Sequence, residues 1–524
     1  MNYKIKYSKR LIPGILLYGL VLLVTFSSKT YAQDTHIYMD STAQVIRGYG
    51  AANIVNWRPD MTNSEINEAF GTGKGQLGFS ILRLRIPPNQ NEWSAYVSTA
   101  KKAYDMGVKI IASPWSPPGS LKTNNSTVAG SLKVDAYGQY AAHLKAFVNY
   151  MANKGVKLYA VSVQNEPDIN VSYESCDWSP NQMLRFVKEY GDSVGTRLMA
   201  PESFQFRRAM SDPILNDSTA AAHLDIVAGH IYGGGLAQYP LAQKKGKEVW
   251  MTEHITDSQD LGNLWPLSLD VGTEMQKVMQ ADMSAYVFWY IVRYYGPIGD
   301  GSNRTIAGAI TKRGYVMSQF SRFIRPGDVR VKSLGPIGRD FTNVMVTAYK
   351  DSANKAIIVA TNANSSSKTI NVILGDSTSG TFHTYITSDA KNVAKGNDID
   401  ASGTGFTTTL PAQSITTFVA DTLHIITTAT EKQPSLPGSF KLLQNYPNPF
   451  NPSTIIRYRL PAARQVTLKV YDILGREVAT LVNGKVSAGE HLVHYDASHL
   501  ASGIYIYRLK AGNFSQIHKM TLIK

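Results

Sequence analysis

The chain has 524 residues, of which 43% are hydrophobic, and this length and composition are typical of a globular protein with more than one domain. Its formal charge is +14. Residues 1–32 contain five basic and no acidic residues, and residues 441–524 contain eleven basic and four acidic ones, so these ends carry +5 and +7. Only +2 remains for the middle of the chain, which argues against a basic stripe, and we predict no nucleic-acid partner.

The first 32 residues have the pattern of an export signal. Basic residues precede an apolar stretch from Ile15 to Phe26, and the run Thr30-Tyr31-Ala32 places small residues at the expected cleavage spacing before Gln33. A membrane anchor is the alternative, but it needs about 20 apolar residues. The apolar stretch between Pro13 and the polar run Ser27-Ser28-Lys29 is shorter than that. We therefore expect residues 1–32 to be a signal peptide and the mature protein to lie outside the cytoplasm.

Eight strand-like runs separated by helix-like stretches follow, which predicts a (β/α)8 TIM barrel over residues 33–325. The segment at about 36–46 can instead join a neighbouring β-domain. The predicted strands are Val45 to Gly50, Ile81 to Ile86, Lys109 to Ser113, Ala160 to Gln164, Arg197 to Pro201, Asp225 to His230, Glu248 to Thr252 and Ala285 to Tyr290.

Helix punctuation supports this alternation. A helix is expected from Val134 to Lys154, because apolar residues recur at helical spacing and Gly155 can end it. A second helix begins at Ser179-Pro180, a capping residue followed by proline at the first helical position.

After Arg325 the pattern changes to alternating β-type runs separated by turn residues, which predicts a β-sandwich side domain at residues 326–422. A polar, proline-containing linker is expected at 423–440, and a last all-β unit at 441–524. The predicted side-domain strands include Asn343 to Tyr349, Ala356 to Thr361, Thr369 to Leu374, Thr381 to Ile386 and Ile415 to Ala420.

Two glutamates stand at the ends of barrel strands. Glu166, in YAVSVQNEPD, follows strand four, and Glu253, in KEVWMTEH, follows strand seven. Side chains at the carboxyl ends of barrel strands converge on one face. Two carboxylates converging there indicate cleavage of a glycosidic bond, in which one donates a proton and the other attacks or activates water.

These motifs carry a family resemblance. QNEP at strand four, WMTEH at strand seven and the following β-domain resemble glycoside hydrolase family 30, and FWYIVRYYGPIGDG at strand eight resembles its subfamily 8, the glucuronoxylanases. The resemblance covers roughly residues 35–421. It implies that Glu166 is the acid/base and Glu253 the nucleophile of a retaining reaction, for which the carboxyl groups should lie about 5 to 5.5 Å apart rather than 6.5 to 9.5 Å.

The resemblance also implies a substrate, xylan that carries glucuronic acid branches. Trp289, Arg293 and Tyr295 match the residues that this subfamily uses to hold the branch. The guanidinium of Arg293 can grip a carboxylate with two charge-assisted bonds, and Tyr295 and Ser258 can add neutral donors. The alternative is that Arg293 pairs with Asp300 or another loop acid. We expect a secreted endo-β-1,4-xylanase directed by these branches.

Other polar candidates each have a plain structural alternative. Asn165 can hydrogen-bond the sugar 2-hydroxyl or cap a loop, and Tyr232 can donate to the nucleophile or pack at the rim. Arg83 and Arg85 point to one face of strand two, where one of them can anchor the nucleophile or form a structural salt bridge.

Three tryptophans lie in loops. Trp115, in the proline-rich SPWSPPGSLK, is expected to stack on a sugar ring, whereas Trp57 and Trp178 can either stack on sugar or plug the barrel top. The single cysteine, Cys176, cannot form an intramolecular disulfide and has no metal-spaced partners, so we predict a packed loop residue.

The tail has its own resemblance. QNYPNPFNPSTIIRYRLP, YDILGREVATLV and GIYIYRLKAG resemble the C-terminal sorting domain of the bacterial type IX secretion system, which implies passage across the outer membrane to the cell surface or medium. The alternative is a β-sandwich that binds sugars.

Several alternatives remain for the whole protein. Within the family they are a xylobiohydrolase, a β-1,6-glucanase or a β-glucosidase, and outside it a non-catalytic carbohydrate-binding surface protein. We expect no cofactor and no catalytic metal, and a monomer.

Overall fold

The structure is a computed structural model that describes residues 32–256, 263–336, 341–426, 439–445, 448–486 and 488–523. Nearly all of the predicted signal peptide and most of the predicted linker lie outside these residues. The chain divides into two compact units, Met1–Thr427 and Thr428–Lys524. Along the described parts of the chain, no helix combines the length and apolarity needed to cross a membrane.

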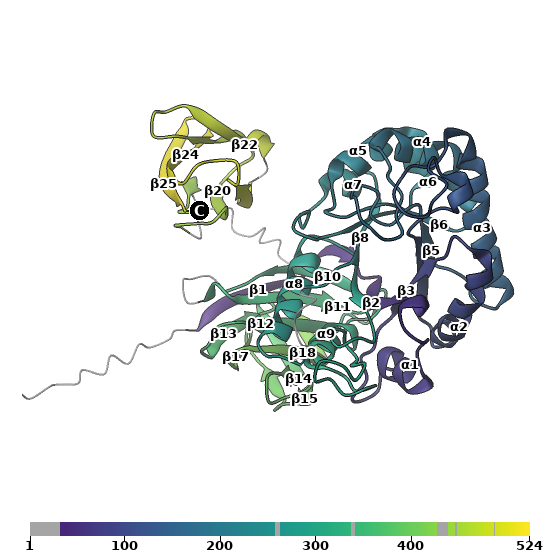
Figure 1. Cartoon of the computed structure of the whole chain (residues 1–524). Coiled ribbons are helices and arrows are strands. Elements are labelled where there is room, and N and C mark those ends of the chain that lie inside the picture. Colours follow the sequence, from purple (N-terminus) through teal and green to yellow (C-terminus); the bar gives the residue numbers. More distant parts are fainter. Residues whose placement is uncertain are drawn as a thin grey trace, which may run out of the picture. The chain divides into compact units, whose positions relative to one another are not determined.

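Eight parallel strands close into a barrel in the first unit, as the sequence predicts (Figure 1). The first strand begins three residues later than predicted, because Val45 pairs with Val329 in a different sheet. The barrel strands are β2 (Gly48–Asn53), β3 (Ile81–Ile86), β4 (Lys109–Pro114), β5 (Ala160–Ser162), β6 (Arg197–Ser203), β7 (Ile226–His230), β8 (Glu248–Glu253) and β9 (Ala285–Tyr290).

Apolar side chains fill the barrel, so it is a packed core rather than a channel. Ile81, Ile111, Met199, Trp250 and Val287 form one fully buried cluster contributed by five strands. Because side chains alternate along a strand, the neighbouring residues face outward and pack against helices. The apolar layer therefore supports polar side chains only at the ends of the strands.

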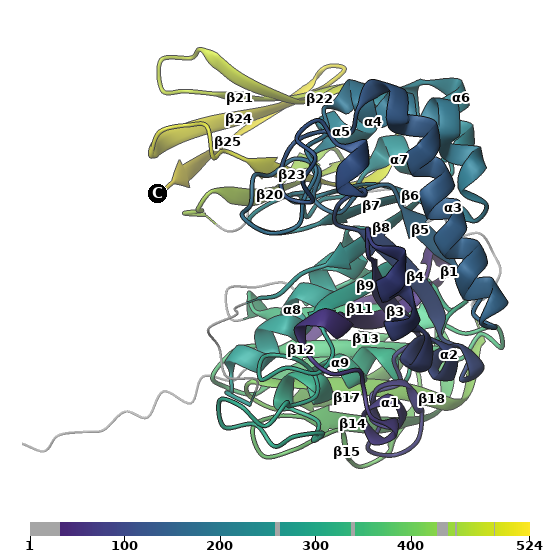
Figure 2. The same cartoon turned by 45° about the vertical axis from the view of Figure 1, so that its right-hand side comes forward.

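Helices cover the outside of the barrel (Figure 2). The helix that begins at Ser179-Pro180 is confirmed: Ser179 and Gln182 form a reciprocal capping box around Pro180. The α-helices are α1 (Asn63–Phe70), α2 (Val97–Asp105), α3 (Tyr137–Asn153), α4 (Pro180–Tyr190), α5 (Arg208–Asn216), α6 (Ser218–His223), α7 (Pro240–Lys244), α8 (Leu267–Gln280) and α9 (Lys312–Ser321).

The side domain is a ten-stranded sheet that folds back on itself. Phe406 of β17 packs against Phe382 of β14 and Phe418 of β18, with ring centroids 4.9 and 5.5 Å apart, although β14 and β17 lie near opposite ends of the strand order. The two halves therefore share one core, as in a sandwich. The strands are β1 (Gln33–Val45), β10 (Val329–Leu334), β11 (Val344–Lys350), β12 (Ala356–Asn362), β13 (Lys368–Ile373), β14 (Ser377–Thr387), β15 (Ala394–Lys395), β16 (Ile399–Ala401), β17 (Gly405–Leu410) and β18 (Ser414–Ile426).

Buried glutamines join the barrel helices to this sheet. Gln276 of α8 donates from Nε2 to the Val359 carbonyl at 2.9 Å and accepts from the Thr347 hydroxyl at 2.6 Å. Gln319 of α9 accepts from the Thr417 hydroxyl at 2.6 Å. Since these amides are fully buried and paired, the barrel and the side domain behave as one packed unit.

The second unit is all β, as predicted, with a three-stranded and a four-stranded sheet. Its core includes Ile456, Leu468 and Tyr507, which come from both sheets. The strands are β19 (Lys441–Leu442), β20 (Ser453–Leu460), β21 (Arg464–Tyr471), β22 (Glu477–Val486), β23 (Gly489–Asp496), β24 (Gly503–Ala511) and β25 (Phe514–Leu522).

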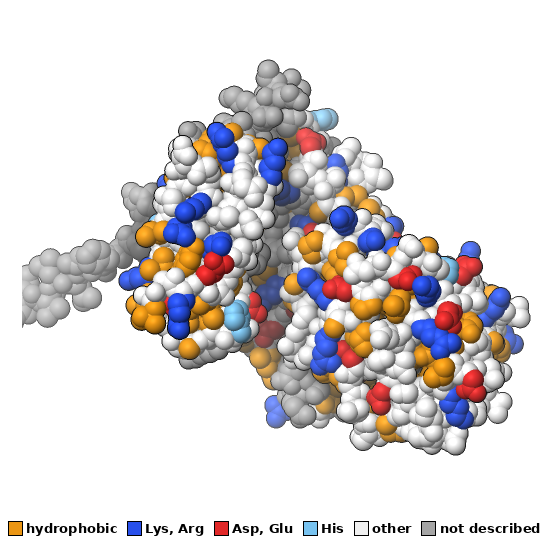
Figure 3. Space-filling view, turned by 90° about the horizontal axis from the view of Figure 1, so that it is seen from above, with side chains coloured by type: hydrophobic (Ala, Val, Ile, Leu, Met, Phe, Trp, Pro, Cys, Tyr) orange, Lys and Arg blue, Asp and Glu red, His pale blue; other side chains and the backbone are white. Residues whose placement is uncertain are grey.

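Charge is mixed on the barrel surface that Figure 3 presents. Acidic and basic side chains are interspersed on the body at the right of that view, with no continuous basic stripe on this face. The mixture agrees with the small net charge counted for the middle of the chain.

We predict that Gln276→Ala lowers the free energy of unfolding by about 2 to 3 kcal/mol, because the Val359 carbonyl and the Thr347 hydroxyl lose a buried partner. Chemical denaturation checks the value. Gln139→Ala, an exposed position on α3, is the control and should change stability by less than about 0.5 kcal/mol. Equal stability of both variants would contradict the proposed contact energy.

Candidate active site

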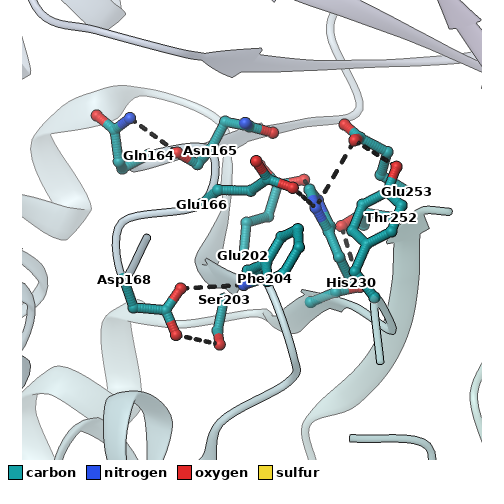
Figure 4. A network of polar contacts seen from close by, with 12 residues as sticks. Gln164, Asn165, Glu166, Asp168, Glu202, Ser203, Phe204, His230, Thr252 and Glu253 are labelled. Carbon is teal, nitrogen blue, oxygen red and sulfur yellow. Dashed lines mark hydrogen bonds and ion pairs between the residues drawn. The ribbon is translucent and has the colours of Figure 1, made fainter. Parts of the chain in front are cut away.

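Glu166 and Glu253 meet at the carboxyl end of the barrel (Figure 4). Glu253 is the last residue of β8, and Glu166 lies four residues beyond β5. Each is only 6% exposed. One carboxylate oxygen of Glu166 lies within 4.8 Å of one of Glu253, so both groups can act on the same bond.

Hydrogen-bond donors hold both oxygens of Glu253. Arg83 donates from Nη1 to Oε2 at 2.6 Å, and the Tyr232 hydroxyl donates to Oε1 at 2.9 Å. These bonds stabilise the ionised carboxylate. Arg83 also donates from Nη2 to Asn165 Oδ1 at 2.6 Å, which leaves the amide nitrogen of Asn165 as the group that can donate to a ligand.

Arg85 has a different role from Arg83, although both point to the same face of β3. It donates from Nε and Nη2 to the two oxygens of Glu174 at 2.6 and 2.8 Å, and its Nη1 lies 3.3 Å from Glu92. Arg85 lies two residues after Arg83 in β3, so its side chain contacts Glu174 and Glu92 rather than Glu166 and Glu253. Arg83 therefore anchors the carboxylate of Glu253, and Arg85 forms a structural salt bridge with Glu174.

Glu202 and His230 belong to the same cluster, and the sequence analysis did not single them out. Glu202, in β6, is fully buried and lies 3.3 Å from Arg83 Nη2. His230 ends β7, pairs in register with Glu253, and places Nδ1 2.9 Å from Glu166 Oε1. Both are polar residues at the ends of predicted strands five and six, so the rule that selected the first two glutamates could have found them.

The backbone is unusual at two of these glutamates. Glu166 and Glu202 have φ values of +48° and +53°, in the left-handed region that residues other than glycine rarely adopt. The Glu166 amide donates to the Glu202 carbonyl at 3.0 Å, which links the two positions directly. Local strain of this kind persists where the surrounding structure enforces it, and it is concentrated at functional sites.

The cluster is strongly coupled electrostatically. Burial raises the pKa of Glu202, but the positive charges of Arg83 and His230 outweigh it and lower that pKa to about 2. Burial raises the pKa of Glu253, while the positive charges of His230 and Arg83 and the Tyr232 hydrogen bond oppose the rise. Glu202 is therefore ionised at neutral pH, and Glu253 depends on its cationic neighbours to remain so.

A second set of contacts fixes the loop that carries Glu166. Asp168 accepts from the Ser203 hydroxyl at 2.7 Å, from the Phe204 amide at 3.0 Å and from Arg207 Nη1 at 3.0 Å (Figure 4). The loop after β5 is thus bound to the end of β6. Phe204 in turn stacks on Tyr232 with centroids 4.9 Å apart, which extends the support to Glu253.

Three tryptophans gather beside β9. Trp57 lies 5.0 Å from Trp115 and 5.4 Å from Trp289 between ring centroids, and Trp115 lies 5.9 Å from Trp289. Trp57 is 50% exposed, whereas Trp115 is buried. Trp57 therefore presents the more accessible indole for stacking on a sugar ring, whereas Trp115 is buried and packs against Trp57.

Trp178 lies in a different place. It is 4% exposed, and its ring packs against Tyr137, Tyr140 and Phe186 of α3 and α4. The packing favours the plugging alternative over sugar stacking for this indole. Residues around it line a cavity of about 390 Å³ next to the Glu166 loop: Ser131, Pro167, Asp168, Ile169, Asn170, Asp177, Ser179 and Gln182.

The predicted branch-binding residues follow β9. The Arg293 side chain is 36% exposed and its guanidinium lies over the rings of Tyr294 and Tyr295 at 5.8 and 5.7 Å. Its Nη1 lies 3.7 Å from Asp300, farther than a hydrogen bond, so the pairing alternative is present only as a weak ion pair. Tyr295 is 8% exposed. Ser258 lies outside the described residues.

Cys176 is buried, as predicted. Burial raises the pKa of its thiol to about 12, so the thiolate that nucleophilic attack requires is negligible at neutral pH.

The donor set does not favour a metal ion at the glutamate pair. Oxygens of Glu166 and Glu253 and a ring nitrogen of His230 are close enough to approach one ion. However, Arg83 already places a positive charge 2.6 Å from Glu253, and Tyr232 occupies its other oxygen. A cation there would be repelled by a guanidinium that cannot lose its proton.

Comparisons with known proteins agree with this fold. Residues 76–248 match the glycosyl hydrolase family 30 TIM-barrel domain, and residues 444–524 match the secretion system C-terminal sorting domain. The chain is 42% identical over 401 residues to glucuronoxylanase XynC of Bacillus subtilis (strain 168), covering 74% of this chain and 92% of that protein.

Solved structures of family 30 xylanases are also similar to this chain. A family 30 endoxylanase from Clostridium papyrosolvens C71 and a family 30 subfamily 8 xylanase from Clostridium acetobutylicum are each 39% identical, with TM-scores of 0.65 and 0.67. Each match covers 74% of this chain and all of the other.

We predict that Glu202→Gln lowers the free energy of unfolding at pH 7 by about 3 kcal/mol, because ionised Glu202 stabilises the fold through Arg83 and His230. A pKa lowered from 4.5 to about 2 contributes stability above pH 4.5 that is lost as the pH falls. The difference between variant and wild type should therefore shrink between those two pH values in denaturant unfolding. Glu189→Gln, a surface position on α4, is the control and should have little effect at any pH.

Proposed function

Because this chain belongs to glycosyl hydrolase family 30, we propose that it is a retaining endo-β-1,4-xylanase that cleaves glucuronoxylan at positions set by glucuronic acid branches. The observation that carries the proposal is the buried pair of Glu166 and Glu253, with oxygens within 4.8 Å, in a chain that spans 92% of a glucuronoxylanase. Oxygens this close are compatible with direct attack by one carboxylate, which needs the carboxyl groups nearer to each other than activation of an interposed water does.

In the first step Glu253 attacks the anomeric carbon and Glu166 protonates the departing glycosidic oxygen. The nucleophile must be ionised, and Arg83 and Tyr232 supply the donors that favour this state. The amide nitrogen of Asn165, oriented by Arg83, can donate to the sugar 2-hydroxyl, a bond that strengthens in the transition state.

In the second step Glu166, now a carboxylate, removes a proton from water, and the water oxygen displaces Glu253 from the anomeric carbon. Two displacements on opposite faces restore the original configuration. The contacts of Asp168 with Ser203 and Phe204 keep the loop of Glu166 in one position for both proton transfers.

Branch recognition is assigned to Arg293 and Tyr295, with Ser258 as a further donor. The guanidinium is partly exposed over the rings of Tyr294 and Tyr295, and only Asp300 lies within ion-pair distance of it among the described residues. It can therefore form a bidentate pair with a uronate. Binding energy from the branch would lower the barrier at the cleaved bond, so undecorated xylan should be a poor substrate.

The tail determines where the protein acts. The chain carries a secretion system sorting domain over residues 444–524, and it is exported to the cell surface or the extracellular space. We assign the type IX machinery as the partner of this domain and propose that the tail plays no part in hydrolysis.

Glu253→Gln and Glu166→Gln should each lower kcat/KM on glucuronoxylan roughly a thousandfold or more, because each removes a group that reacts. Release of reducing sugar measures this loss. Glu248→Gln is the matched control, since Glu248 lies at the opposite end of β8 and pairs with Arg47 and Arg197 rather than with the glutamate pair, so kcat/KM should change little.

Proton NMR of the first products should show the β-anomer. Initial formation of the α-anomer would contradict the retaining mechanism, and full activity of Glu253→Gln would contradict its assignment as nucleophile.

Arg293→Ala should lower kcat/KM on glucuronoxylan about 100-fold, the equivalent of two charge-assisted hydrogen bonds, and change hydrolysis of linear xylan by about twofold or less. Arg293→Lys is the matched variant, because it keeps the charge but loses the planar fork, and it should recover only part of the loss. An equal loss on both substrates would remove Arg293 from branch recognition.

A further inference from the structure

His230 lies between three carboxylates at the centre of the site (Figure 4). Its side chain is fully buried. Nδ1 is 2.9 Å from Glu166 Oε1 and 3.9 Å from Glu253 Oε1, and Nε2 is 3.7 Å from Glu202 Oε1. These acids come from the loop after β5 and from β6 and β8. Glu166 and Glu253 lie at Nδ1, and Glu202 lies at Nε2.

Both ring nitrogens therefore face carboxylate oxygens, which only accept hydrogen bonds when ionised. A neutral imidazole would turn a lone pair toward one of them, whereas the doubly protonated ring presents an N–H to each side. Burial lowers the pKa of His230, but the charge of Glu253, the hydrogen bond to Glu166 and the nearby carboxylate of Glu202 raise it to about 10. The other groups near the cluster are Arg83, Tyr232 and Tyr173, whose hydroxyl lies 3.4 Å from Glu166.

The charges of these groups can be balanced. Arg83 and His230 are positive and Glu202 is negative, so a buried site with no net charge requires one proton to be shared by Glu166 and Glu253. The donors from Arg83 and Tyr232 direct the negative charge to Glu253. The proposed reaction requires this proton on Glu166, the general acid.

We propose that His230 is a positioning residue that stays positively charged through both displacements and keeps the buried site neutral while the proton and the covalent bond change places. The proposal rests on the proposed retaining reaction. When the Glu253 oxygen bonds the anomeric carbon and the glycosidic bond breaks, Glu253 loses its charge. At the same moment Glu166 gives its proton to the leaving oxygen and gains a charge beside His230 Nδ1.

The second displacement reverses this exchange. Water bonds the anomeric carbon, the ester bond to Glu253 breaks, and the water proton passes to Glu166. The net charge of the site is zero before and after each step, and the hydrogen bond from His230 strengthens whenever Glu166 is ionised. No burial of an uncompensated charge accompanies either transition state.

The pH dependence of kcat/KM on glucuronoxylan tests the proposal, because its two limbs report the ionisation of Glu253 and Glu166. His230→Gln removes a positive charge, which makes both ionisations harder, so both limbs should move to higher pH by about one unit. Glu202→Gln removes a negative charge and should move both limbs to lower pH. A residue that only packs the site would lower activity without moving the limbs in opposite directions.

His143→Gln is the matched control. His143 is also buried in the barrel unit, but burial lowers its pKa to about 4, so it is neutral, and its replacement should leave both limbs in place. Limbs that do not move in either site variant, or that move in the same direction in both, would overturn the proposal.

NMR of the full chain labelled with ¹⁵N-histidine gives a second readout that does not need activity and serves if His230→Gln does not fold. At pH 8 one histidine should carry protons on both ring nitrogens, and in Glu202→Gln, which keeps Glu166 and Glu253, this histidine should titrate at a lower pH than in the wild type. If the wild-type chain did not hydrolyse glucuronoxylan, the proposed function would be refuted. A singly protonated His230 in the wild type would refute this inference alone.

Discussion

The guanidinium of Arg83, from the middle of β3, is buried where it donates to Glu253 and Asn165 and pairs with Glu202. Three other strand ends thus meet at one positive charge. A buried cation is stable only when its partners are correctly placed, and each partner is stable only beside the cation. The positions of Glu253, the proposed nucleophile, and of the Asn165 amide therefore depend on a single side chain, which no lysine with its compact charge could replace.

Constraints from the backbone add to this charge cluster. Glu166 and Glu202 are held with positive φ and are joined by a backbone hydrogen bond, and Asp168 ties the same loop to Ser203 and Phe204. The packed apolar layer below prevents the strand ends from moving apart. The acid/base is thus fixed by its loop, whereas the nucleophile is fixed by donors to its carboxylate.

Chemistry and recognition are located on different strands. The reacting carboxylates follow β5 and end β8, whereas Arg293 and the exposed indole of Trp57 lie beside the end of β9 and the loop after β2. A substrate that reaches from one region to the other is held at both, so a branch can contribute to the rate at a bond it does not adjoin. In the proposed mechanism a buried histidine among acids balances charge rather than binding a metal.

The sequence by itself determined the barrel, the side β-domain and the all-β tail, because strand and helix periods and turn residues are local properties of the chain. It also placed Glu166 and Glu253 at strand ends, and the motifs around them and around Arg293 indicated the family. Only the tertiary structure separated Arg83 from Arg85, moved Trp178 into the aromatic core and brought His230 and Glu202 into the cluster with the two glutamates. Those outcomes depend on strand register and loop path, which join residues 82 to 170 positions apart and leave no local pattern in the sequence.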